Sequence, residues 1–223
     1  ELTELESDSV QLNASTLKPG ANRRRMGEDL MAGQPAMRAG QYLTPAALGL
    51  LASLGLQTLM VFRRLIVAYF STGDEILSLG EVPREGAVYD SNRYTLTGLL
   101  TRMGVEVIDM GVVPDQPAAM QSAFERAASE TDAIVTSGGV SMGDADHTRA
   151  IMAQKGDVNF WRIAMRPGRP MAFGQLRAAD SNNMGAWLFG LPGNPVAAMV
   201  TFLIFVRPAL QRLMGCTAPA PAL

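Results

Sequence analysis

The chain has 223 residues, of which 48 % are hydrophobic and 18 % charged, and this composition excludes an intrinsically disordered protein. The 19 Lys and Arg residues against 21 Asp and Glu leave a net charge of -2, which supplies no broad positive field for nucleic acid. No apolar run is long enough to cross a bilayer, and the first residues carry no signal-peptide pattern. We therefore expect a cytoplasmic protein with no membrane or nucleic-acid partner. The single Cys216 excludes an internal disulfide bond.

Residues 1–61 lack the regular alternation of the later sequence. They combine an acidic start, the basic cluster Arg23–Arg25 and a glycine-rich stretch. Thr44 followed by Pro45 predicts the start of a short helix, which Gly55 ends. We interpret residues 1–61 as part of a neighbouring β-containing domain that serves linking or dimerisation.

Residues 62–215 have the pattern of a parallel α/β domain. The apolar runs LIVAYF, VEVIDM and AIVTS alternate with segments of helical period, one of which should begin at Asp115. Three further strand-like runs follow, VNFWRIAM, MAF and AWLFGL, and then a long helix with Asn194 as N-cap. The predicted fold is a three-layer α/β/α domain with a mostly parallel sheet, followed by a tail of residues 216–223.

Ligands of such sheets bind outside the carboxyl ends of the strands, so the loops that follow strands are the places to search for chemistry. The first strand is followed by Ser71–Glu75, in which Asp74 and Glu75 offer the hard oxygen ligands that suit Mg²⁺. The same two carboxylates could instead form a solvated acidic turn.

The loop of residues 137–146 is rich in glycine and could turn backbone N–H groups toward a phosphate. It ends with Asp144 and Asp146, and one aspartate is enough to cap the next helix, which leaves the other for a metal. His147 is the only histidine, so His-based catalytic triads and paired-His metal sites are excluded.

Two later segments also suit an anion. Arg162, Arg166 and Arg169 surround a rigid Pro-Gly turn, and arginine forks match phosphate oxygens, although surface arginines are common without such a role. The sequence Gly190–Pro195 joins a strand to the long helix and presents that helix N-terminus, while a plain helix cap would explain Asn194 and Pro195 alone.

Five motifs in this order resemble the molybdopterin molybdenumtransferase family, whose members include bacterial MoeA proteins and the gephyrin E domain. They are STGDE, YDSN, SGGVSMGDAD, FWRIAMRPGRPMAFG and GLPGNPVA. Upstream, Arg24–Asp29 resembles the arginine-x-x-GED loop of the family, so the resemblance runs from Arg24 to about Leu213. Such enzymes insert molybdate into adenylylated molybdopterin with Mg²⁺ and release AMP, and they are generally homodimers.

The resemblance implies roles for individual residues. Glu75 and Asp146 would hold Mg²⁺ near molybdate, with Asp74 and Asp115 as further catalytic carboxylates. The substrate would be bound by Thr72, Gly73, Asp90, Asn92, Ser137, Gly138, Gly139, Ser141, Arg162, Arg166, Arg169, Pro192, Gly193 and Asn194, and by Arg24 and Asp29 of the upstream loop. Relatives often carry lysines where this chain has the three later arginines.

Two other functions compete with the transferase. One is the related molybdopterin adenylyltransferase, which shares the fold but typically reads Gly-Gly-Thr-Gly where this chain has Gly138, Gly139, Val140 and Ser141. The other is a non-catalytic pterin-binding scaffold. The resemblance also implies contact with the adenylyltransferase that makes the substrate.

Overall fold

The computed structural model describes residues 3–6, 9–12, 18–139, 156–177 and 184–217. The chain divides into two units, of which the first comprises Glu1–Ala39 with Leu43–Gln57, and the second Gly40–Tyr42 with Thr58–Leu223. The first unit contains the antiparallel pair of β1 (Thr3–Glu6) and β2 (Ser9–Leu12), followed by α1 (Pro45–Ser53). Helix α1 begins as predicted, because the Thr44 side chain accepts a hydrogen bond from the backbone of Ala47 at 3.2 Å.

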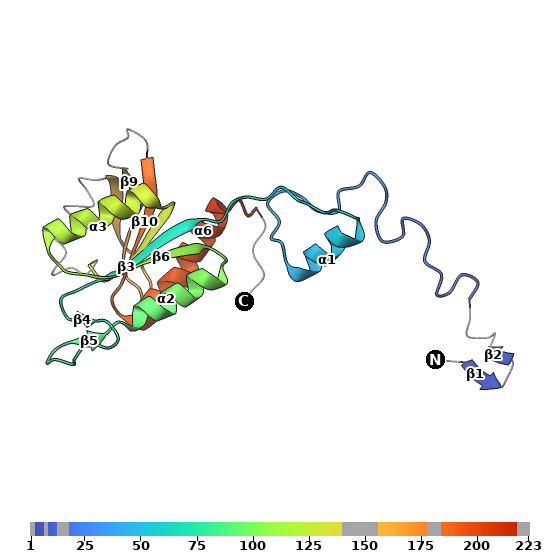
Figure 1. The fold of residues 1–223 in the computed structure, drawn as a ribbon, viewed down its shortest axis with the longest axis horizontal. Coiled ribbons are helices and arrows are strands. Elements are labelled where there is room, and N and C mark those ends of the chain that lie inside the picture. The colour runs from blue at the N-terminus through green and yellow to red at the C-terminus, as the bar shows by residue number, and fades with distance from the viewer. Residues whose placement is uncertain (1–2, 7–8, 13–17, 140–155, 178–183, 218–223) are drawn as a thin grey trace. The chain divides into compact units, whose positions relative to one another are not determined.

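The second unit is built on one six-stranded sheet with the order β6-β3-β7-β10-β9-β8 (Figure 1). Its strands are β3 (Ile66–Thr72), β6 (Glu106–Val113), β7 (Ala133–Ser137), β8 (Gly156–Arg162), β9 (Pro170–Arg177) and β10 (Met184–Leu191). The first four strands in the sheet run parallel, and β9 and β8 join by antiparallel pairing. The prediction of a mostly parallel sheet is confirmed.

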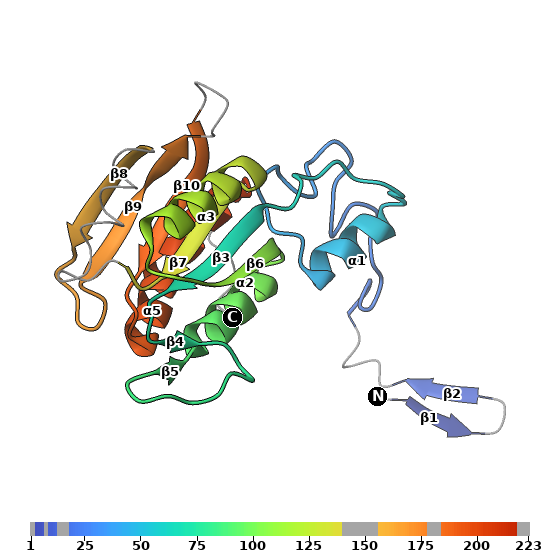
Figure 2. The same ribbon diagram turned by 60° about the vertical axis from the view of Figure 1, so that its left-hand side comes forward.

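Helices cover both faces of this sheet, as Figure 2 shows. On one face lie α2 (Ser91–Arg102) and the helical segment from Pro195 to Leu213, whose Leu96, Leu100 and Phe202 side chains join one buried cluster. On the other face lies α3 (Pro117–Glu130), which buries Met120, Phe124 and neighbouring alanines. Alternate residues of β3 point into the two clusters, and the three-layer α/β/α prediction is thereby confirmed.

Helix α3 begins two residues later than the sequence pattern indicated. The backbone N–H of Asp115 donates to the Asp74 carboxylate at 3.1 Å, which places Asp115 outside the helix. Gln116 is extended, with φ −115 and ψ 131, because the residue before a proline avoids the helical region. The expected start at Asp115 was therefore wrong, and Pro117 takes the first helical position.

The segment Pro195–Leu213 comprises α5 (Pro195–Thr201), a π-helical turn (Phe202–Val206) and α6 (Arg207–Leu213). The π turn precedes Pro208, which has no N–H and whose ring clashes with the carbonyl four residues earlier. By length and composition this 19-residue segment could cross a membrane. One face of it is nevertheless buried against the sheet through Ala198, Phe202 and other residues of the same cluster, which is the packing of a core helix.

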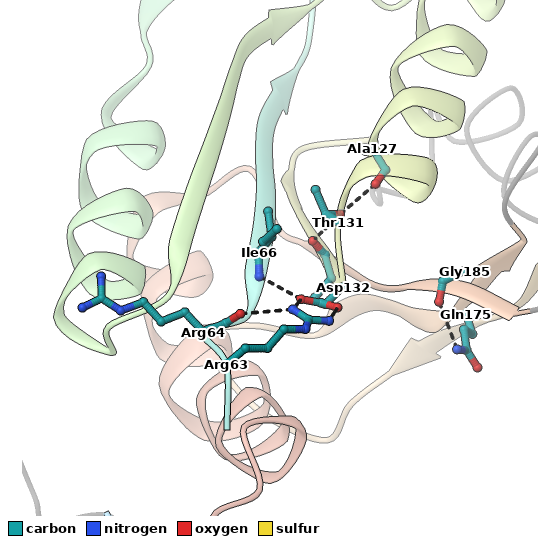
Figure 3. A network of polar contacts seen from close by, with 9 residues as sticks. Arg63, Arg64, Ile66, Ala127, Thr131, Asp132, Gln175 and Gly185 are labelled. Atoms are coloured by element: carbon teal, nitrogen blue, oxygen red, sulfur yellow. Dashed lines mark hydrogen bonds and ion pairs between the residues drawn. The ribbon is translucent and has the colours of Figure 1, made fainter. Parts of the chain in front are cut away.

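A polar network fixes the amino edge of the sheet (Figure 3). The Arg63 guanidinium donates to both carboxylate oxygens of Asp132, at 2.7 and 2.5 Å, and the backbone N–H of Ile66 donates to the same carboxylate at 2.9 Å. The backbone of Asp132 also bonds to Ile66 at the start of β3 and to Trp187 within β10. Asp132 therefore ties three strands together at the edge opposite the predicted site.

Candidate functional site

The loops that follow β3, β7 and β10 meet at the carboxyl edge of the sheet. The backbone N–H of Gly138, which follows β7, donates to the carbonyl of Leu191 at the end of β10 at 3.1 Å. A Cβ on Gly138 would lie 2.4 Å from the carbonyl oxygen of Thr72, and one on Gly193 would lie 3.9 Å from the Gly138 Cα. These contacts bring together three segments that are distant in the sequence, as the strand order predicted.

Buried hydroxyl and amide groups hold this edge together. The Tyr69 hydroxyl lies 2.7 Å from the Ser71 hydroxyl and 3.1 Å from that of Ser137, and the two serine hydroxyls are 3.2 Å apart. The amide nitrogen of Asn92 donates to Ser137 Oγ at 3.3 Å and to the carbonyl of Gly193 at 2.8 Å. Burial raises the pKa of the Tyr69 phenol, so its hydroxyl keeps its proton.

Asp90 caps α2 at this edge. Its side chain accepts a 3.0 Å hydrogen bond from the backbone of Arg93, and the residue is almost completely buried. Among the described residues, Asp90 Oδ2 and Asn92 Oδ1 are buried with no hydrogen-bond partner. Both of these buried acceptors lie at the N-terminus of α2.

The carboxylates predicted after β3 lie in a loop that carries the short parallel pair β4 (Ile76–Leu77) and β5 (Val88–Tyr89). Asp74 accepts the backbone N–H of Asp115, which links this loop to the one after β6. The exposed carboxylate of Glu75 folds back over Gly73, where an added Cβ would lie 2.7 Å from Glu75 Oε2. The structure thus brings Asp74 close to Asp115.

Two of the predicted residues, Ser141 and Asp146, lie outside the described residues, as does His147. Within the part of the chain that the structure describes, no group of three His, Cys, Asp or Glu side chains is placed to hold a metal. The pairing of Glu75 with Asp146 therefore stays a prediction.

The three arginines lie in and beside the β8–β9 turn. Because β8 runs in the same direction as β10, this turn stands at the same carboxyl edge as the glycine loops. The turn is closed by a 2.8 Å hydrogen bond from the Ile163 backbone to Arg169, and Gly168 packs against Thr201 of α5. Arg162, Arg166 and Arg169 are exposed, and none of them forms an ion pair with a described residue.

The loop after β10 has the predicted helix cap. Asn194 accepts the backbone N–H of Ala197 at 3.1 Å, and Pro195 takes the first position of α5. Pro192 is buried, whereas Gly193 and Asn194 are exposed. The cap is confirmed, and it leaves the backbone of Gly193 at the open edge.

In the first unit, the loop of Arg24 to Asp29 is closed on itself. Arg24 donates to the Asp29 carboxylate at 3.0 Å, and Glu28 accepts the backbone N–H of Arg25 at 2.8 Å. Both Arg24 and Asp29 are exposed. Their charges are therefore paired with each other at the surface of that unit.

Sequence patterns did not identify Tyr69 as a residue of this edge, whereas they placed Ser71 at the end of the first strand. Tyr69 lies within a run that reads as an ordinary apolar strand, and its hydroxyl and that of Ser71 meet Ser137 because β3 pairs in register with β7. The signal that could have pointed to this network is the presence of hydroxyl side chains near the carboxyl ends of two otherwise buried strands.

Comparison with known proteins identifies both parts of the chain. Residues 68–212 match the family model described as a probable molybdopterin binding domain, and residues 1–55 match the MoeA N-terminal region, domains I and II. A protein of Haemophilus influenzae named molybdopterin molybdenumtransferase is 46 % identical over 198 residues, which cover 89 % of this chain and 47 % of that protein. Molybdopterin molybdenumtransferase 2 of Mycobacterium tuberculosis is 37 % identical over 218 residues, or 95 % of this chain and 52 % of that protein.

Solved structures agree with these matches. A molybdopterin biosynthesis MoeA protein of Pyrococcus horikosii superposes with a TM-score of 0.72 at 32 % identity, covering 86 % of this chain and 46 % of its own. The MoaB protein of Pyrococcus furiosus, at 18 % identity and a TM-score of 0.50 over 70 % of this chain and 99 % of its own, shares the fold. The chain spans about half the length of the curated relatives it matches. It belongs to the molybdopterin-binding domain family, and its similar relatives are MoeA-type molybdopterin molybdenumtransferases.

Proposed function

We propose that the protein containing this chain inserts molybdate into adenylylated molybdopterin and releases AMP, as a molybdopterin molybdenumtransferase. The observation that carries the proposal is the convergence of the loops after β3, β7 and β10 with an arginine-bearing turn at one edge of the sheet. Relatives that match most of the chain carry this name. The chain has the order of motifs that distinguishes the transferase from the adenylyltransferase.

The proposed substrate is an anion with a heterocycle, and the edge suits both parts. The backbone of Gly139 and Gly193 and the three arginines, which form no ion pair with a described residue, would bind phosphate oxygens, together with Thr72 and Gly73. The buried acceptors of Asp90 and Asn92 would take hydrogen bonds from N–H groups of a pterin ring. These residues thus offer opposite hydrogen-bonding character to the two ends of one ligand.

Mg²⁺ fits the donor chemistry of the site, because Glu75 and Asp146 are carboxylates and Asp74 and Asp115 supply further oxygens. When bound, the cation would neutralise charge on the phosphoanhydride between the pterin phosphate and AMP. The arginines would stabilise the same charge, so the hydrolysis requires positioning and electrostatics rather than a nucleophilic side chain. Molybdate, itself an anion, would be held near the pterin dithiolene until the sulfurs replace its oxygens.

The proposal also covers the location of the enzyme, its oligomeric state and the roles of its domains. We propose a cytoplasmic homodimer in which residues 1–61 act as a partial linking or dimerisation domain and residues 62–215 as the catalytic domain, with residues 216–223 as a tail. The Arg24–Asp29 loop would then complete the site of the partner, and the adenylyltransferase would deliver the substrate.

The deciding experiment supplies adenylylated molybdopterin to the whole protein with Mg²⁺ and follows AMP release with and without molybdate. We expect release that depends on both molybdate and Mg²⁺. Tight binding of the adenylylated pterin without turnover would instead support a scaffold function, and formation of adenylylated pterin from ATP would support an adenylyltransferase.

A further inference from the structure

We propose that Tyr69 is a positioning residue of this edge, a role that rests on the function proposed above. Its hydroxyl orders Ser71 and Ser137, and through Asn92 it fixes the backbone of the loop after β10. Tyr69 touches no ligand in this proposal. It acts by keeping the glycine loops after β7 and β10 at a fixed separation.

The hydrogen-bond capacity of the three hydroxyls supports a closed arrangement. Tyr69, Ser71 and Ser137 form a triangle with sides of 2.7, 3.1 and 3.2 Å, and each hydroxyl has one hydrogen to donate. Three hydrogens are enough for the three sides if each group donates to the next around the ring. Each hydroxyl then donates once and accepts once within the triangle, and such rings reinforce their own bonds.

Ser137 Oγ has one more hydrogen-bond partner than the other two hydroxyls. Its remaining lone pair accepts the bond from Asn92 Nδ2 at 3.3 Å, so its capacity of one donor and two acceptors is full. The second hydrogen of Asn92 Nδ2 goes to the carbonyl of Gly193 at 2.8 Å. Neither the Ser137 hydroxyl nor the Asn92 amino group can therefore donate to a ligand without breaking a bond of this network.

Burial makes the network costly to disturb. Tyr69 is 0 %, Ser71 1 % and Ser137 3 % exposed, so water cannot replace a lost partner. The Tyr69 ring is fixed in the cluster beneath α2, which anchors its hydroxyl to the core of the domain. The side chains of Tyr69, Ser71, Ser137 and Asn92 thus connect the rigid core to the Gly193 carbonyl. We assign Ser137 and Asn92 to positioning the loop backbone.

The test compares Tyr69→Phe with Thr136→Val in the whole protein. Thr136 is the neighbour of Ser137 on β7, and its buried hydroxyl has no partner among the described residues, so Thr136→Val removes a buried hydroxyl without breaking the network. Amide hydrogen exchange is measured at Gly138, whose N–H donates to the Leu191 carbonyl, and is corrected for global stability from urea unfolding. Steady-state AMP release gives kcat and KM for adenylylated molybdopterin.

We expect Tyr69→Phe to accelerate exchange of the Gly138 amide by about tenfold beyond the global change, which corresponds to one lost buried hydrogen bond. KM should rise by about the same factor while kcat changes less, because the loops bind the substrate before chemistry. Thr136→Val should leave both readouts unchanged. Unchanged exchange and unchanged KM in Tyr69→Phe would overturn the proposal.

Two further outcomes can be distinguished from a failure of the positioning role. If the unsubstituted protein releases no AMP, the proposed function fails, and the exchange measurement alone decides whether Tyr69 positions the loops. If Tyr69→Phe does not fold, Ser71→Ala opens the same triangle by a smaller change, and the Gly138 amide should then exchange faster. Absence of that local change in Ser71→Ala would refute the positioning role.

Discussion

Gly138 lies directly against the backbone of Thr72, at a distance that leaves no room for a side chain. A Cβ on Gly138 would stand 2.4 Å from the Thr72 carbonyl oxygen, and Gly138 has a φ of +88°. Residues other than glycine are strained in this region of φ, and here a backbone clash is added. The contact joins the loop after β7 to the loop after β3.

We therefore expect Gly138→Ala to lower the free energy of unfolding by about 1–3 kcal/mol and to abolish molybdate-dependent AMP release. Urea unfolding and the AMP assay check the two effects. Gly98→Ala is the control, because Gly98 lies on the exposed face of α2 with no atom within 4 Å of an added Cβ. That substitution should stabilise the protein by about 0.5–1 kcal/mol. A Gly138→Ala variant as stable as the parent would mean that the two loops do not touch.

Glu75→Gln tests the proposed Mg²⁺ ligand. Glu75 is exposed, and in the described structure its carboxylate is not part of a hydrogen bond or ion pair, so we expect an unchanged melting temperature. The Mg²⁺ concentration for half-maximal AMP release should rise at least about tenfold, because an amide is a weaker ligand than a carboxylate. We expect the same of Asp146→Ala.

Glu81→Gln is the matched control for the change of charge, since Glu81 is exposed in the same loop between β3 and α2. Its Mg²⁺ dependence should equal that of the parent. Equal Mg²⁺ dependence in Glu75→Gln and Glu81→Gln would remove Glu75 from the metal site. A large fall in melting temperature in Glu75→Gln would instead indicate a structural role.

Arg166→Ala and Arg169→Ala test the anion contacts of the β8–β9 turn. Each should raise KM for adenylylated molybdopterin by roughly 10- to 100-fold, the value of one charge-assisted hydrogen bond of about 1.5–3 kcal/mol. Lysine should restore part of the loss, because it keeps the charge and loses the planar fork. Both arginines are exposed, so circular dichroism melting should not change.

Arg177→Ala serves as the control for these variants. Arg177 is exposed at the other end of β9, at the amino edge of the sheet, so the same charge is removed far from the turn. An equal rise of KM in Arg177→Ala would show that only the overall charge matters.

Asp132→Asn tests whether the network at the amino edge makes the stability of the fold depend on pH. The hydrogen bond from Arg63 holds the pKa of the Asp132 carboxyl below its usual value, and the Ile66 backbone N–H acts in the same direction. Because the carboxyl has a lower pKa in the folded state, its ionised form stabilises the fold at pH values above the unfolded pKa of about 3.9. This stabilisation is lost as the pH falls through the pKa of the folded state. Asp132→Asn should therefore lower the melting temperature at pH 7, and the difference from the parent should shrink toward pH 2–3.

Thermal unfolding at several pH values checks this, with Asp157→Asn as the control, because Asp157 is exposed on the edge strand β8 and forms no ion pair with a described residue. A difference between Asp132→Asn and the parent that does not depend on pH would show that the carboxylate charge has no part in the stabilisation.

The sequence by itself determined the layers of the fold and the edge at which chemistry should occur. The apolar runs LIVAYF and AIVTS, the segments of helical period between the strands, and the caps at Thr44 and Asn194 are local properties of the chain, so they could be recognised without coordinates. The ordered motifs likewise led to the family, which the comparisons confirmed.

Only the tertiary structure decided which side chains of these motifs face one another. The contacts of Asp74 with Asp115, of Gly138 with Thr72, and of Asn92 with Gly193 join residues that are 41, 66 and 101 positions apart. Such pairs follow from strand register and from the path of each loop, and neither is encoded in a local pattern. For the same reason Tyr69 could not be distinguished from an ordinary core aromatic residue until β3 and β7 were paired.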